Sequence, residues 1–181
     1  MSRSLSCSAA AAVAHAFVTS RMDHCSSILA GLPLAQTARL DRVLRCTARL
    51  IGRIPKYGSV SAYMRDTLHL LPIAQRISYR IAVLVWRCLL GSAPGYLYEL
   101  CRPVSGLPGR QALRSSATGQ LLVPRAKTAT RQRRAFSIAG PSTWNGLPLE
   151  IRILPKNNES AFCRLLKTAW SVSPWLGWGR L

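Results

Sequence analysis

The segment spanning residues 34–54 constrains the fold most, because its apolar and charged residues recur with the period of an α-helix. At about 100° per residue, its arginines occupy one arc of the helix and its apolar residues occupy the opposed arc. The arginines are Arg39, Arg42, Arg45, Arg49 and Arg53, and the apolar residues are Leu40, Val43, Leu44, Leu50, Ile51 and Ile54. The pattern predicts an amphipathic helix with an apolar stripe toward the core and an arginine stripe outward.

Other stretches also favour helices. An N-terminal helix is predicted over residues 8–29, ended by Gly31 and Pro33, and shorter ones over 59–70 and 96–101. Two more amphipathic helices are predicted over 73–90 and 159–170. The longest apolar run in the first of these, residues 81–86, is far shorter than the roughly 20 residues of a membrane span. It therefore predicts a buried central helix.

Composition changes at Arg102, where prolines and glycines form a linker. Residues 121–123 and 131–136 then favour a small β-hairpin. We predict a mainly α protein: a helical region over residues 1–102, and a basic hairpin, a Trp-Asn segment and a last helix over 103–170. Residues 171–181, which hold two tryptophans and two glycines without periodicity, are expected to be a poorly ordered tail.

The charge balance indicates a polyanionic partner. The chain has 25 Lys and Arg against 6 Asp and Glu, a net charge of +19, and most of the cations are arginine, which suits bidentate phosphate contact. This favours nucleic acid first and an anionic membrane second. Besides the arginine stripe, an acid-free basic tract supplies the candidate binding residues Arg110, Arg114, Arg125, Lys127, Arg131, Arg133 and Arg134. For the stripe, an ordinary solvated face remains the alternative.

The sequence offers little material for catalysis. Its six cysteines have no close pairs and no Cys-x-x-Cys spacing, so we expect reduced thiols, several of them buried, and neither a zinc site nor a disulfide framework. The chain holds three histidines, and Asp23, Asp41 and Asp66 stand isolated. We therefore predict no metal, no cofactor, no small-molecule substrate and no catalytic residue.

Residues 134–148, RAFSIAGPSTWNGLP, form the most specific stretch. The dipeptides Gly140-Pro141 and Asn145-Gly146 are typical of turns. They predict that Trp144 lies on a short turn or a helix of one to two turns, with its indole inward. We interpret Phe136, Trp144 and Pro148 as structural anchors, because buried aromatic residues are usually part of a core.

The order of several motifs resembles the C-terminal region of reverse transcriptases from non-LTR (LINE-type) retrotransposons, the part that follows the polymerase palm. Among them are LHLLPIAQRISYRI, GSAPGYLYEL and RAFSIAGPSTWNGLPLEIR. The resemblance covers about residues 13–170, with matching pieces at 15–33, 40–51, 68–81, 91–100, 113–125, 134–152 and 160–170. It departs from the family at Leu70, where a Trp is usual, in its low acid content and after Trp170.

The resemblance implies a thumb-like helical bundle that contacts RNA or DNA. It also implies that the chain is not an enzyme, because the family's palm, with its pair of metal-binding carboxylates, and its endonuclease have no counterpart here. A palm-bearing reverse transcriptase acting in trans is an implied partner. The similarity reaches His15, which favours a nuclear or cytoplasmic location and an N-terminal helix over a mitochondrial or secretory presequence.

Three hypotheses follow. The first is a non-catalytic module that binds RNA or DNA through phosphate contacts. The second is a degenerate retroelement remnant without selected activity, whose charge is inherited. The third is a basic protein associated with a membrane or with mitochondria.

Overall fold

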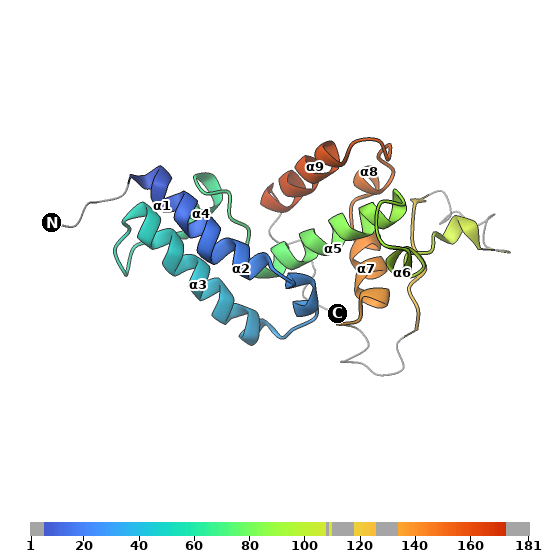
Figure 1. Cartoon of the computed structure of the whole chain (residues 1–181), viewed down its shortest axis with the longest axis horizontal. Coiled ribbons are helices and arrows are strands. Elements are labelled where there is room, and N and C mark those ends of the chain that lie inside the picture. Colours follow the sequence, from blue (N-terminus) through green and yellow to red (C-terminus); the bar gives the residue numbers. More distant parts are fainter. Residues whose placement is uncertain (1–5, 108, 110–117, 126–133, 173–181) are drawn as a thin grey trace. The chain divides into compact units, whose positions relative to one another are not determined.

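The structure is a computed structural model that describes residues 6–107, 109, 118–125 and 134–172. These residues are mainly helical, which confirms the predicted fold class (Figure 1). Among them there is no strand, and β-type pairing is limited to an isolated antiparallel bridge between Pro103 and Leu121. No helix in the described ranges is long and apolar enough to cross a membrane.

The chain forms two compact units. Unit 1 comprises Met1–Ser26 and Leu32–Arg76, and unit 2 comprises Ser27–Gly31 and Ile77–Leu181. The long helix α5 (Ile73–Leu89) begins in unit 1, and its residues from Ile77 onward belong to unit 2. The composition change at Arg102, where the sequence suggested a division, lies inside unit 2.

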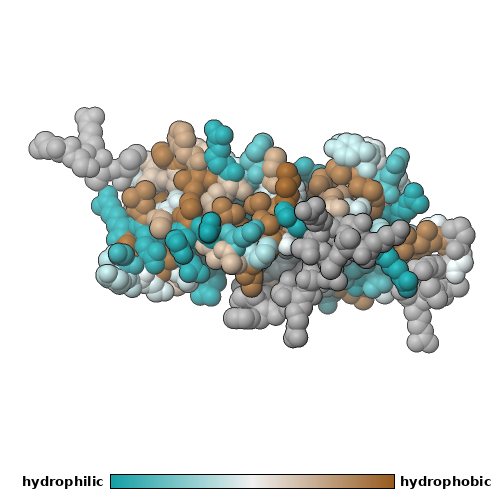
Figure 2. All heavy atoms as spheres, turned by 90° about the horizontal axis from the view of Figure 1, so that it is seen from below, coloured by the Kyte–Doolittle hydropathy of each residue, from teal (hydrophilic) through white to brown (hydrophobic). Residues whose placement is uncertain are grey.

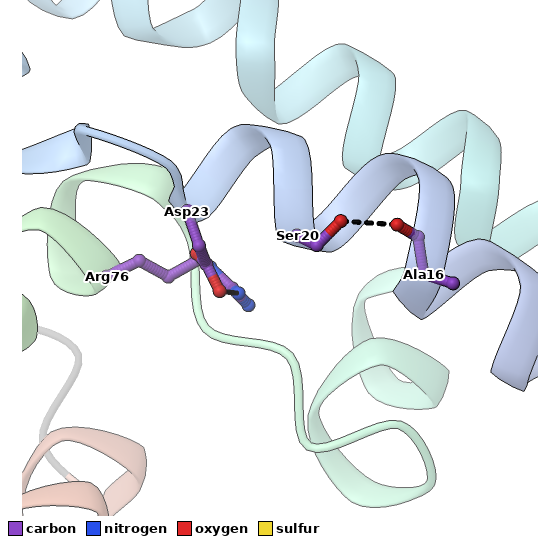
Figure 3. Close-up of polar contacts among 4 residues, drawn as sticks. All are labelled: Ala16, Ser20, Asp23 and Arg76. Atoms are coloured by element: carbon purple, nitrogen blue, oxygen red, sulfur yellow. Dashed lines mark hydrogen bonds and ion pairs between the residues drawn. The ribbon is translucent and has the colours of Figure 1, made fainter.

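Unit 1 begins with α1 (Cys7–Ala14), a π-helical turn (His15–Thr19) and α2 (Ser20–Asp23), which follow one another without a break. Ser20 Oγ donates a hydrogen bond to the Ala16 carbonyl along this stretch (Figure 3). The helix predicted over 8–29 therefore ends early. The backbone conformation is extended at His24 and left-handed at Cys25, where φ is 53°. A 3₁₀ turn over Ser26–Leu29 follows.

Helix α3 (Leu34–Gly52) packs against α1, the π-helical turn and α4 (Ser61–Asp66). Leu44 and Ile51 are buried as predicted, but Val43 is 46% exposed and Leu50 is 77% exposed. These two residues lie at the edge of the apolar arc, beside the arginines. The core side is completed instead by the small residues Thr37, Thr47 and Ala48, and each threonine hydroxyl donates to a carbonyl one turn earlier in α3.

Two aspartates hold unit 1 together. Asp23 forms a bidentate ion pair with Arg76, with Nη2–Oδ2 at 2.6 Å and Nε–Oδ1 at 3.0 Å, and both side chains are about five-sixths buried (Figure 3). Asp41 Oδ1 accepts the Ile73 backbone N–H at 2.9 Å. An acid on α3 thus caps the N-terminus of α5, where backbone donors lack helical partners.

Unit 2 is built around a cluster of three aromatic rings. The Trp86 and Phe162 rings stack at 4.2 Å, and Trp144 lies about 6 Å from both, at 6.2 Å and 6.0 Å respectively. All three side chains are fully buried. The rings come from α5, α7 (Phe136–Asn145) and α9 (Glu159–Val172); the unit also holds α6 (Gly95–Tyr98), a 3₁₀ turn (Val104–Gly106) and α8 (Leu149–Arg152).

Two sequence predictions for unit 2 were wrong. The β-hairpin is not formed as predicted, because Phe136 opens α7 and Leu121 pairs with Pro103; residues 126–133 lie outside the described residues. The Gly140-Pro141 dipeptide does not break the chain but lies inside α7. Pro141 lacks the helical N–H, yet its ring is buried in the core, and a Cβ on Gly140 would lie 3.2 Å from Phe136 ring carbons and Val85 Cγ2. Close packing therefore favours a dipeptide that local sequence rules assign to a turn.

Candidate nucleic-acid interface

The arginine face of α3 is the most concentrated charge in unit 1. Arg39, Arg42 and Arg45 are exposed, and within the described part of the chain no carboxylate lies at ion-pair distance from them. Figure 2 shows hydrophilic side chains gathered over the part of the molecule that holds α3, with hydrophobic ones among them. The first three arginines of the predicted stripe therefore form a solvent-facing surface on a regular helix.

The spacing of these arginines makes them repel one another. From Arg39 to Arg53, successive members of the stripe are three or four residues apart and form four neighbouring like-charged pairs on the helix surface. Each such pair costs about 0.2–0.5 kcal/mol, so the stripe costs roughly 1–2 kcal/mol at low salt. A bound polyanion would remove this repulsion.

The last two members of the stripe differ from the first three. Arg49 is half-buried, and its Nε is buried without a hydrogen-bond partner among the described residues. Arg53 ends α3 in the left-handed conformation, with φ 50°. Within α3, the exposed arginines are therefore Arg39, Arg42 and Arg45.

Several of the protein's few acids are engaged in contacts away from this face. Asp23 pairs with Arg76, Asp66 pairs with Arg65 at 2.9 Å, and Glu159 pairs with Arg87 at 2.7 Å. Asp41 is the one acid within α3, and its Oδ1 is directed at the start of α5. The carboxylates therefore serve internal contacts instead of neutralising the stripe.

The second predicted group, the basic tract, is mostly beyond what the structure describes. Arg125 is exposed, whereas Arg110, Arg114, Lys127, Arg131 and Arg133 lie outside the described residues. Arg134 is half-buried and donates from Nε to the Ala30 carbonyl and from Nη2 to the Ile28 carbonyl, both at 3.2 Å. These contacts hold residues 27–31 within unit 2, a structural use that sequence reasoning missed because the two segments are far apart in the chain.

The Trp-Asn dipeptide secures the segment around Leu121. Trp144 Nε1 donates to the Gly119 carbonyl at 2.8 Å. Asn145 Oδ1 accepts the Leu121 N–H and its Nδ2 donates to the Leu121 carbonyl, each at 2.8 Å. Phe136 and Pro148, the other two predicted anchors, are half-buried.

Within the described residues, no three His, Cys, Asp or Glu side chains gather where they could hold a metal ion. No protein-family model, curated protein or solved structure matches the chain.

Proposed function

We propose that this chain is a non-catalytic nucleic-acid-binding module, equivalent to the region that follows the palm in non-LTR retrotransposon reverse transcriptases. The observation that supports this most is that Arg39, Arg42 and Arg45 on α3 are exposed and form no ion pair with any residue that the structure describes. The proposed family rests on the resemblance of the sequence motifs, and the proposed partner, a nucleic acid, rests on the excess of positive charge.

The geometry of α3 suits a phosphate backbone. Residues three or four apart on a helix are separated by about 4.5–6 Å along its axis. Since each strand of B-DNA presents one phosphate per roughly 3.4 Å of its axis, the stripe supplies about one cation for every one to two phosphates. Arginine also donates in a planar fork that matches phosphate oxygens.

Such contacts imply binding with little sequence preference. Phosphate contacts fix register and orientation, whereas sequence is selected through base edges. The proposed module would therefore grip an RNA or DNA backbone for a palm encoded elsewhere, and primer extension by the purified chain alone should show no nucleotide incorporation.

The test is fluorescence anisotropy with labelled RNA and DNA oligonucleotides of unrelated sequence. The variant Arg39→Gln/Arg42→Gln/Arg45→Gln should bind at least about tenfold more weakly, because three phosphate contacts are lost. The control Arg21→Gln/Arg164→Gln/Lys167→Gln removes the same charge from exposed sites outside the stripe and should bind nearly as well as the unmodified chain.

Equal losses in the two triple variants would refute a specific role for α3 and indicate attraction by net charge alone. Binding only to vesicles with anionic lipids, and not to either nucleic acid, would favour membrane association. Circular dichroism of each variant checks that the helices are retained.

A further inference from the structure

The connection between α3 and α4, residues 53–60, carries the most exposed large apolar side chain in the part of the chain that the structure describes (Figure 1). This side chain is that of Tyr57, which is 92% exposed. Lys56 beside it is also exposed, and its ammonium lies over the Tyr57 ring, 5.6 Å from the ring centroid. An aromatic ring that takes no part in the core and lies beside a cation is therefore accessible to a ligand.

The Tyr57 ring is presented from a hydrogen-bonded turn. The chain leaves α3 at Arg53, whose backbone is left-handed. The Gly58 N–H then donates to the Pro55 carbonyl at 2.9 Å, which places Lys56 and Tyr57 at the two central positions of a four-residue turn. Because the turn is already formed, ordering it on binding costs little conformational entropy.

The turn continues the basic surface of α3. Arg53, four positions before Tyr57, is exposed, and residues 42–65 contain no Asp or Glu. Four residues span at most about 14 Å, so the ring lies close to the last arginine of the stripe. Leu50, which is 77% exposed, lies near the same end of α3. This end of the helix therefore combines cations with exposed apolar side chains.

Cations and apolar side chains contact different parts of a nucleic acid. Cations bind the phosphates, whereas aromatic side chains stack on the faces of the bases. In a duplex these faces are covered by the neighbouring bases, and an unpaired base exposes them. An exposed ring next to a phosphate-binding surface therefore favours a single strand over a duplex.

We propose that Tyr57 stacks on an unpaired base, so that α3 and the turn after it bind single-stranded RNA or DNA in preference to a duplex. This inference rests on the proposed nucleic-acid function and specifies its substrate. The bound nucleic acid follows α3 from Arg39 toward Arg53, over a rise of about 21 Å, with its phosphates on the arginines and one base on the ring. The Lys56 ammonium then lies near the phosphate of the stacked nucleotide.

Fluorescence anisotropy with an unstructured single strand and a hairpin duplex of equal phosphate number tests the proposal. Tyr57→Ala should weaken single-strand binding roughly 5- to 100-fold, the effect of losing one stacked base, and leave duplex binding within about twofold. Tyr57→Phe keeps the ring and should bind like the unmodified chain. The matched control is Tyr96→Ala, which removes an exposed tyrosine of α6 in unit 2 and should change neither affinity.

A second measurement requires no new variant. A strand in which abasic sites replace most bases keeps its phosphates but offers no base for stacking. The unmodified chain should bind this strand more weakly than the ordinary one, by at least the factor that Tyr57→Ala loses. Because Tyr57→Ala removes no charge, the salt dependence of its binding should equal that of the unmodified chain.

Equal affinities of Tyr57→Ala and the unmodified chain for the single strand, or an equal loss on the duplex, would overturn the proposal. Salt-dependent binding that weakens in Arg39→Gln/Arg42→Gln/Arg45→Gln would in that case still support the proposed function. If the unmodified chain binds neither form, the proposed function fails and the stacking site fails with it. Circular dichroism of Tyr57→Ala checks that its helices are retained.

Discussion

At the scale of single residues, the Asn145 side chain pairs with backbone groups in the way that a neighbouring chain segment would. Its amide group pairs with both backbone groups of Leu121. On the other side of this segment, the Gln120 carbonyl accepts Val104 N–H and the Leu122 N–H donates to the Arg102 carbonyl. Backbone groups of residues 120–122 are therefore paired on both sides, and on the Asn145 side the partner is a side chain.

Replacing Asn145 with alanine should reduce the free energy of unfolding by about 1–3 kcal/mol, because two hydrogen bonds are lost. Asn145→Asp should also destabilise, since its second oxygen would face the Leu121 carbonyl. The control is Asn157→Ala, at an exposed asparagine without these contacts. Urea unfolding followed by tryptophan fluorescence measures all three; equal stability of the Asn145 and Asn157 variants would contradict the assignment.

Cys101 should make the protein less stable in alkali. Its pKa is raised by burial from 9.0 to about 12, so the folded state binds the proton more tightly than the unfolded state does. This contribution is complete below pH 9 and is lost as the pH rises from 9 toward 12. Urea midpoints measured with reductant should fall between pH 8 and pH 10 by more in the unmodified chain than in Cys101→Ala. An identical fall in both would show that Cys101 is not responsible.

At the scale of secondary structure, α5 depends on an acid from another helix. Its first backbone N–H is capped by Asp41 of α3, which also lies among the arginines in sequence. One side chain thus joins two helices within unit 1. Its charge and its hydrogen-bonding oxygen can be separated by substitution.

The variant Asp41→Ala should lower the free energy of unfolding of unit 1 by about 1 kcal/mol, because a helix cap is lost. Asp41→Asn removes the same charge but keeps an oxygen acceptor, and should retain most of the stability. Thermal denaturation followed by circular dichroism compares them. If the asparagine variant is as unstable as the alanine variant, the effect comes from charge and not from capping.

Long periodic segments were predictable from the sequence, and contacts between distant segments were not. Helices α3, α5 and α9 begin within one residue of their predicted starts, because many residues contribute to an amphipathic pattern. Helix α7 is longer than the turn or short helix predicted around Trp144, because Gly140 and Pro141 disfavour helices locally while their tight burial favours one.

The candidate site likewise has features that the sequence could predict and features that it could not. The stripe on α3 follows from helical geometry, so its position could be predicted, but the exposure of Val43 and Leu50 depends on which neighbours pack against the helix. The contacts of Arg134 with the Ala30 and Ile28 carbonyls join segments that no local pattern connects.

At the scale of the whole molecule, positive charges far outnumber the acids that could neutralise them. The 25 Lys and Arg exceed the 6 Asp and Glu by 19 charges, and at least four of the six acids are already engaged in the ion pairs and the helix cap. A surplus of this size destabilises a compact state and attracts polyanions. It makes folding and binding depend on ionic conditions.

A functional module should nevertheless fold. We expect the purified chain to be monodisperse and to melt cooperatively, because unit 2 has a close-packed aromatic core and unit 1 has a buried ion pair. Size-exclusion chromatography and calorimetry check this. A molten species that binds hydrophobic dyes would instead support the hypothesis of a degenerate remnant.

The salt dependence of nucleic-acid binding tests the central proposal most directly. The logarithm of the association constant is measured against the logarithm of salt concentration for the unmodified chain and the two triple variants. Each phosphate contact contributes about 0.7–0.9 to the slope, so Arg39→Gln/Arg42→Gln/Arg45→Gln should reduce the slope by roughly 2–3. The control variant should keep the original slope. Tight binding that does not change with salt, or an unchanged slope in the α3 variant, would contradict the proposal.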